Sequence, residues 1–220
     1  MNNFAYLAAI FLLFAVWLFL FLKKPYRREM IVMSAIFTPF ALLDFWFLQD
    51  YWSPETFLGT KFGLETFLFA FIIGGIAAVI YEEFRGLRLV KSRKQPNWVL
   101  TGSTIILFLN FLALKIVGVN SMYSLYGVFI AATIFILAQR RDLIVDVVGS
   151  GVLFGILGFV LYLIYLTLFP NIIEQWWNLN DLSGVLVFGI PLEELLFAFG
   201  FGMVAGPLYE VWQGYRLEKR

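Results

Sequence analysis

The sequence predicts an all-α membrane protein with seven transmembrane helices, arranged as three helices, a connector helix and three more. First, 61% of the 220 residues are hydrophobic and only 14% are charged, whereas soluble domains usually have about 45–50% apolar and about 25% charged residues. Second, nearly all positively charged residues lie in alternate loops between apolar segments. Third, the two halves of the chain share one pattern of glutamate, tyrosine and glycine residues.

The apolar segments have the length that membrane-spanning helices need. A transmembrane helix requires roughly 17–25 predominantly apolar residues. Seven segments satisfy this requirement, and they cover residues 4–22, 30–48, 62–81, 98–117, 123–139, 143–169 and 185–208. The first segment lacks a basic leader and a small-residue cleavage site, so we expect it to be a retained helix and not a signal peptide.

The loops between these segments alternate in charge. All Lys and Arg residues except Lys61 and Lys115 lie within residues 23–29, 82–97, 140–141 and 216–220. Because positively charged loops stay on the cytoplasmic side of a membrane, we expect the N-terminus outside and the C-terminus inside. We expect the protein to be an integral protein of the cell (plasma) membrane.

Residues 62–86 and 190–214 form an internal repeat at a constant offset of 128 residues. Matches of Leu, Phe or Ala arise easily between membrane helices, so the polar and glycine matches carry the comparison. These pair Glu65 with Glu193, Gly74 with Gly202, Tyr81 with Tyr209, Glu82 with Glu210 and Gly86 with Gly214. We predict a first repeat over residues 1–97, a connector over 98–117 and a second repeat over 118–220. Each helix of the second repeat comes four helices after its counterpart in the first. Both copies therefore cross the membrane in the same direction, which makes the repeat parallel.

The composition excludes several kinds of site. The chain has no cysteine and no histidine, which removes disulfides, thiolate metal sites, Ser-His triads and His-ligated metals. It has no glycine-rich nucleotide motif, and a net charge of +1 does not indicate nucleic-acid binding. Asp142 and Asp146 have the spacing of a Mg²⁺–diphosphate site, but no second acidic cluster accompanies them. We therefore expect no metal, no cofactor and no nucleic acid.

Three glutamates lie deepest in the apolar segments: Glu65, Glu193 and Glu194. An ionisable group inside a transmembrane segment costs about 2.5–3.5 kcal/mol or more, and such groups usually have a function. Removal from water favours the neutral acid more strongly than a helix N-terminus favours the anion. We therefore expect a protonated carboxylic acid that can donate a proton. The alternative is that these acids cap helix N-termini at the outer interface.

Adjacent helical residues point about 100° apart, so Glu193 and Glu194 cannot both face one cavity squarely. Because the repeat pairs Glu65 with Glu193 but Thr66 with Glu194, we expect Glu65 and Glu193 to face each other. Aromatic residues surround these positions, and most of them are expected in packing and in the interfacial belt. Some can line a pocket in which aromatic faces stabilise a cation. Our candidates for substrate binding are Asp44, Trp52, Phe69, Trp177 and Phe197.

Several short motifs recur in the two halves. The first half has LD at 43–44, LET at 64–66 and YE at 81–82, and the second has GIPLEELLFAFGFG at 189–202 and PLYE at 207–210. Together they resemble the two halves of the small integral-membrane lycopene cyclases, whose subunits occur as heterodimers or fused in one chain. That family has a proline–apolar–Glu–Glu motif in each half. The second half keeps it at residues 191–194, whereas the first half has Gly63, Leu64, Glu65 and Thr66.

The resemblance implies an enzyme that cyclises the end group of a linear carotenoid, an intramolecular lyase or isomerase of the lycopene β-cyclase type. An acid protonates the terminal double bond, the next alkene attacks the cation, and a base removes a proton. We assign Glu193 as the acid, with Glu65 or Glu194 as the base. The expected partners are a carotenoid dissolved in the membrane and the lipid bilayer itself.

Two other functions stay open at this point. A small proton-coupled transporter can have the same parallel repeat, although a hydrophilic substrate would need more Asn, Gln, Ser or Thr in the helices. A non-catalytic carotenoid- or isoprenoid-binding membrane protein is the second alternative, favoured by the change from Glu to Thr at position 66. The sequence also leaves open whether the chain forms a homo-oligomer.

Overall fold

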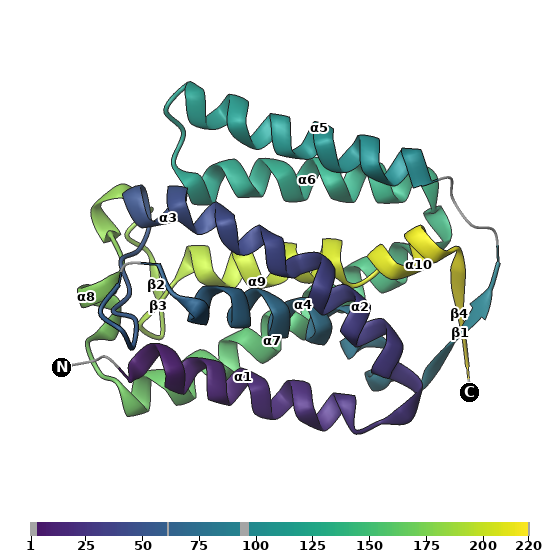
Figure 1. The fold of residues 1–220 in the computed structure, drawn as a ribbon, viewed down its shortest axis with the longest axis horizontal. Coiled ribbons are helices and arrows are strands. Elements are labelled where there is room, and N and C mark those ends of the chain that lie inside the picture. The colour runs from purple at the N-terminus through teal and green to yellow at the C-terminus, as the bar shows by residue number, and fades with distance from the viewer. Residues whose placement is uncertain (1–3, 61, 93–96, 220) are drawn as a thin grey trace. The chain divides into compact units, whose positions relative to one another are not determined.

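The computed structural model describes residues 4–60, 62–92 and 97–219, most of which are helical (Figure 1). The chain divides into two compact units, and each takes residues from both halves of the sequence. The first unit comprises residues 1–76 and 156–196, and the second comprises residues 77–155 and 197–220. This division follows contacts within the structure, and the division into two repeats stays a prediction.

The first unit consists of helices and the loops that join them at residues 51–63 and 177–191. Its elements are α1 (Ala5–Phe21), the 3₁₀ helix η1 (Lys24–Tyr26), α2 (Arg27–Phe37), η2 (Thr38–Leu43), α3 (Asp44–Asp50), the first part of α4 (Leu64–Arg85), the second part of α7 (Ile144–Leu168), α8 (Ile172–Trp176), η4 (Leu179–Asp181), β2 (Leu186–Val187), β3 (Ile190–Pro191) and the start of α9 (Leu192–Ala205). The predicted helix over 30–48 is interrupted by η2, because Pro39 at its start cannot donate a helical hydrogen bond.

The second unit holds the remaining parts of α4, α7 and α9 together with the other elements. These are β1 (Leu87–Lys91), α5 (Asn97–Ile116), α6 (Ser121–Gln139), η3 (Arg141–Leu143), α10 (Leu208–Gln213) and β4 (Tyr215–Lys219). Within this unit α5 and α6 lie side by side and are joined by a short turn (Figure 1). The last helix is broken between α9 and α10, with Pro207 as the N-cap of α10.

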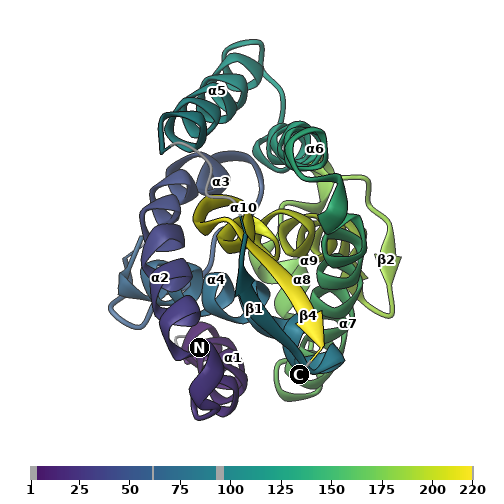
Figure 2. The same cartoon turned by 90° about the vertical axis from the view of Figure 1, so that its right-hand side faces the viewer.

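Two short antiparallel sheets correct the all-α prediction. β1 pairs with β4, with Leu89 opposite Leu217 at the centre (Figure 2). β2 pairs with β3 in a hairpin whose two turn residues, Phe188 and Gly189, have φ of 53° and 83°. Such positive φ values at both positions match the twist of a two-residue hairpin. The strands are five residues long or shorter, which is too short for an alternating pattern to stand out in the sequence.

The start of α9 also differs from the prediction. Residues 185–191 were expected in the last transmembrane segment. Pro191 instead ends β3, and α9 begins at Leu192. Glu193 and Glu194 are therefore the second and third residues of the helix.

Five helical segments among the described residues are long and apolar enough to cross a membrane: Lys24–Asp50, Leu64–Arg85, Ser121–Gln139, Arg141–Leu168 and Leu192–Gln213. Each contains most of one predicted segment. The other two predicted segments correspond to shorter apolar helices at Ala5–Phe21 and Thr104–Ile116. These helices indicate a membrane protein, and the count of seven spans stays a prediction.

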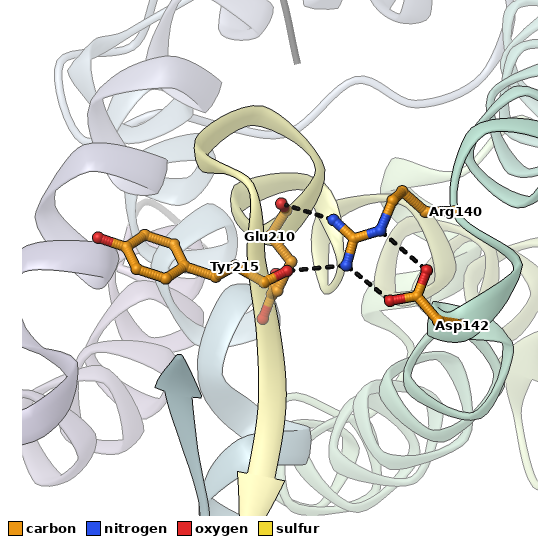
Figure 3. A network of polar contacts seen from close by, with 4 residues as sticks. All are labelled: Arg140, Asp142, Glu210 and Tyr215. Atoms are coloured by element: carbon orange, nitrogen blue, oxygen red, sulfur yellow. Dashed lines mark hydrogen bonds and ion pairs between the residues drawn. The ribbon is translucent and has the colours of Figure 1, made fainter. Parts of the chain in front are cut away.

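Arg140 connects the chain that enters α7 with the C-terminal segment of the second unit. Its guanidinium donates to both carboxylate oxygens of Asp142, at 2.8 and 2.7 Å (Figure 3). It also donates to the main-chain carbonyl oxygens of Glu210 and Tyr215, at 3.3 and 2.8 Å. Asp146 accepts a hydrogen bond from Ser150 at 3.0 Å. The two aspartates of the D-x-x-x-D spacing therefore have different partners.

Glycine allows α7 and α9 to approach each other closely in the second unit. A Cβ added at Gly202 would lie 2.6 Å from the carbonyl oxygen of Ser150 and 3.0 Å from the Cα of Gly151. Gly206, one turn further along the chain, would likewise overlap the side chain of Ser150. Small residues four apart are typical of closely packed membrane helices.

We therefore expect Gly202→Ala to lower the stability of the protein. The added methyl group must push the two helices apart, and such overpacking costs about 1–3 kcal/mol. The thermal unfolding midpoint in detergent measures this effect. The control is Gly102→Ala in α5, where a Cβ meets no atom within 4 Å. A Gly202→Ala protein that is as stable as Gly102→Ala would contradict the close packing.

Candidate active site

The candidate site is built in the first unit around two tryptophans, Trp52 and Trp177. They lie opposite each other in an isolated antiparallel bridge between the loop after α3 and the loop after α8. The backbone N–H of Ser53 donates to the carbonyl oxygen of Trp176 at 2.7 Å, and that of Asn178 donates to the carbonyl oxygen of Tyr51 at 2.8 Å. The centroids of the two rings are 5.7 Å apart. This bridge fixes both indole groups.

Glu194 lies beside this bridge and is 9% exposed. The Nε1–H of Trp177 donates to its Oε1 at 2.8 Å, and the Tyr51 hydroxyl donates to the same oxygen. The Tyr162 side chain also lies near this carboxyl group and contacts the ring of Trp177. Burial, followed by the proximity of Glu194, raises the pKa of Tyr51 well above its usual range, so this hydroxyl keeps its proton.

Asp44, the first residue of α3, occupies a similar position beside the other tryptophan and is 8% exposed. The Nε1–H of Trp52 donates to its Oδ1 at 2.8 Å. The Thr66 hydroxyl donates to its Oδ2 at 3.2 Å, and the Tyr6 hydroxyl donates to Thr66 Oγ1 at 3.4 Å. Asp44 was expected to bind substrate, and the structure gives it two hydrogen-bond donors, one from α4 and one from the loop after α3.

Aromatic side chains join these two carboxyl groups into one cluster. Tyr6 contacts Trp52 and Trp176, with ring centroids 5.4 and 6.3 Å apart. Trp177 contacts Trp176 and Tyr162, with centroids 6.4 Å apart in both cases. Most of these rings are buried, and their faces surround the site with polarisable surface. Such an arrangement can transfer a proton and stabilise a cation away from water.

Glu65 and Glu193 hold the two loops that precede their helices. Glu65 Oε1 accepts a hydrogen bond from the backbone N–H of Phe57 at 2.7 Å. Glu193 Oε1 accepts one from the backbone N–H of Ser183 at 2.8 Å. Both carboxyl groups are buried, with 6% and 3% exposure. These contacts give the two repeat-related glutamates the same structural role, which is to accept a hydrogen bond from an amide of the preceding loop.

The glycine at position 63 is explained by the same arrangement. A Cβ added at Gly63 would overlap the Oε2 atom of Glu65, and it would lie 3.1 Å from the side chain of Thr56. A side chain at position 63, including a proline as in the second half, would require the Glu65 carboxyl group and Thr56 to shift. Gly63 leaves room for the Glu65 carboxyl group beside its own loop.

The two phenylalanines chosen from the sequence lie in different units. Phe69 is half-buried on α4 in the first unit. Phe197 is half-buried on α9 in the second unit, where its ring contacts Phe129 and Phe201 with centroids 6.0 and 5.7 Å apart. Their part in substrate binding stays a prediction.

Three tyrosines of this site were not singled out from the sequence: Tyr6, Tyr51 and Tyr162. All three are buried or half-buried. The usable signal was the hydroxyl group itself, because a buried tyrosine usually has a hydrogen-bond partner.

Comparison with known proteins finds one family to which part of the chain is similar. Residues 120–212 match the lycopene cyclase family model. This range includes Tyr162, Trp177, Glu193 and Glu194, and it confirms the resemblance found in the sequence. The lycopene cyclase match supports a carotenoid cyclase, and hence an enzyme, in general terms. It does not reach the first half of the chain, where Asp44 and Thr66 lie. No curated protein and no solved structure matches the chain.

The loop contacts of the two glutamates predict a reciprocal effect on hydrogen exchange. Glu193→Ala should speed exchange of the Ser183 amide and leave the Phe57 amide unchanged, and Glu65→Ala should do the reverse. A buried donor that loses its partner costs about 1–3 kcal/mol, which corresponds to roughly 5- to 150-fold in exchange rate. Hydrogen–deuterium exchange mass spectrometry of the purified protein measures both sites, so each variant is the control for the other. Equal protection of both amides in the two variants would contradict this role.

Proposed function

We propose that the protein is a lycopene cyclase that isomerises the linear end group of its substrate by acid–base chemistry, without a redox step. One observation carries the proposal. Glu194 is buried among indole and hydroxyl donors of an aromatic cluster, within the range that matches the lycopene cyclases. A soluble substrate would not need such a site, whereas a hydrocarbon alkene needs a strong proton donor in apolar surroundings.

The reaction requires one proton to enter and one to leave. Protonation of C2 in the terminal C1=C2 bond leaves a tertiary cation at C1. The C5=C6 bond then attacks C1, which closes a six-membered ring and moves the cation to C5. Loss of the proton from C6 gives the β-ring and restores neutrality. The faces of Trp52, Trp176 and Trp177 support this proposal, because aromatic rings stabilise a nearby cation.

We propose Glu194 in place of Glu193 as the proton donor. The hydrogen bonds from Tyr51 and Trp177 both end on Glu194 Oε1, so in the neutral acid the proton belongs on Oε2. Glu193 contacts the backbone of its own loop, as Glu65 does, and we propose that these two glutamates hold the loops around the site. The substrate is a carotenoid dissolved in the lipid bilayer.

We also propose that the chain has seven spans in a parallel 3+1+3 repeat, with the N-terminus outside and the C-terminus inside the plasma membrane. The register of the β1–β4 sheet supports the repeat. Under the offset of 128 residues β1 corresponds to β4, and Leu89 lies opposite its own counterpart, Leu217. When a local two-fold axis relates two antiparallel strands, the central residue of one strand lies opposite its own counterpart in the other strand. The matched loop contacts of Glu65 and Glu193 support the same relation.

We expect the protein to form monocyclic or bicyclic products when it is produced in a lycopene-accumulating bacterium. Glu194→Gln should abolish cyclisation, with at least a roughly 100-fold loss, because the amide accepts the same hydrogen bonds but cannot donate the proton. Pigment analysis by liquid chromatography measures the products. A single size-exclusion peak of the purified protein in detergent shows that each variant is folded.

The matched control is Glu174→Gln, which changes an exposed glutamate on α8. It should cyclise lycopene as the unchanged protein does. Unchanged lycopene with a well-folded protein would favour carotenoid binding or transport instead. Full activity of Glu194→Gln would remove Glu194 from the mechanism.

A further inference from the structure

At position 66 the first half lacks a carboxyl group that the second half has at the matching position. The second half has Glu194 there, with a carboxyl group inside the aromatic cluster, and the first half has Thr66. Thr66 is buried at 6% exposure, and its hydroxyl donates to Asp44 Oδ2 at 3.2 Å. The repeat predicts a carboxyl group at position 66, where this chain has a threonine. Thr66 instead contacts the carboxyl group of Asp44.

The same tryptophan–carboxyl contact occurs twice around the bridge. Trp52 donates from Nε1 to Asp44 at 2.8 Å, and Trp177 donates from Nε1 to Glu194 at 2.8 Å. The two indole rings contact each other, so both carboxyl groups belong to one aromatic cluster. Acid–base isomerisation needs a second group to remove the proton, and this cluster offers a second carboxyl group in Asp44.

We infer that Asp44 is the carboxylate that removes the proton after ring closure, and that Thr66 is a positioning residue that orients it. This inference rests on the proposed cyclase function. Protonation uses the proton of Glu194, and Asp44 takes the proton lost from C6, so the substrate is isomerised with no net gain or loss of atoms. Transfer from Asp44 back to Glu194, through solvent or side chains, restores both groups for the next turnover.

The contacts of Asp44 suit a group that works as a carboxylate. Each of its oxygens accepts a hydrogen bond, Oδ1 from Trp52 and Oδ2 from Thr66, and such bonds stabilise the charged form. These two donors are uncharged, so they orient the carboxylate without neutralising it as an arginine would. Tyr6 donates to Thr66 Oγ1, which directs the hydroxyl hydrogen of Thr66 toward Asp44.

The test uses membranes that contain the full chain, incubated with lycopene in D₂O buffer. Asp44→Asn should reduce ring formation about 100-fold or more, in the range of general base catalysis. Protonation by Glu194 continues in this variant. The cation can then lose the original hydrogen of C2 to Glu194 and keep the deuteron there, so mass spectrometry should find deuterium in the recovered acyclic lycopene. Glu194→Gln should give neither ring nor label, because no deuteron is delivered.

Two substitutions at position 66 distinguish a positioning role of the Thr66 hydroxyl from a purely structural role of the side chain. Thr66→Val keeps the shape but loses the hydroxyl, and it should reduce ring formation roughly 10-fold, as expected for loss of one hydrogen bond. Thr66→Ser keeps the hydroxyl and should retain most of the rate. The matched control for Asp44 is Asp50→Asn at the end of the same helix, α3, which should cyclise lycopene normally.

The outcomes distinguish this inference from the proposed function. Normal ring formation by Asp44→Asn, or equal activity of Thr66→Val and Thr66→Ser, overturns the inference and leaves the cyclase proposal standing. A folded Asp44→Asn protein with neither ring nor label also overturns it, because protonation would then depend on Asp44. An unchanged protein that forms no ring and no label removes both the cyclase proposal and the role of Asp44.

Discussion

The bridge between Trp52 and Trp177 is the contact on which the candidate site depends. Each tryptophan pairs with the other through the backbone, and each uses its indole N–H to hold a carboxyl group. A carboxyl group removed from water needs donors inside the protein, since an unsatisfied buried polar group costs about 1–3 kcal/mol or more. The bridge provides those donors from rigid side chains whose position is set by main-chain hydrogen bonds. Moving either loop would disturb both acids together.

The four acidic residues near the site divide into two kinds. Asp44 and Glu194 contact side chains, and these side chains belong to the aromatic cluster. Glu65 and Glu193 contact backbone amides of the loops that lead into their own helices. The second pair fixes the loops, and the first pair is then presented to the interior. Adjacent glutamates at positions 193 and 194 can thus have different tasks, because neighbouring helical residues point in different directions.

The sequence allowed the apolar helices, the deep acids and the family resemblance to be recognised, because each has a long or chemically unusual pattern. Apolar length located the five helical segments of the described residues that are long enough to cross a membrane, to within seven residues at their ends. The division of labour among the acids could not be predicted, because it depends on loop residues such as Phe57 and Ser183 whose positions are set by tertiary contacts. The contact between Asp44 and Thr66 could not be predicted either, because these residues lie on different helices. The short strands were missed because they have five residues or fewer.

The β1–β4 sheet has a consequence for how the two halves of the chain depend on each other. Each strand obtains its ladder partners from the other half of the sequence. A single half produced alone would leave a five-residue strand with open amide and carbonyl groups, and such open edges recruit other polypeptides. Because the two halves are covalently linked, each strand has its partner strand at a high effective concentration. This linkage protects each half from pairing with an unrelated chain.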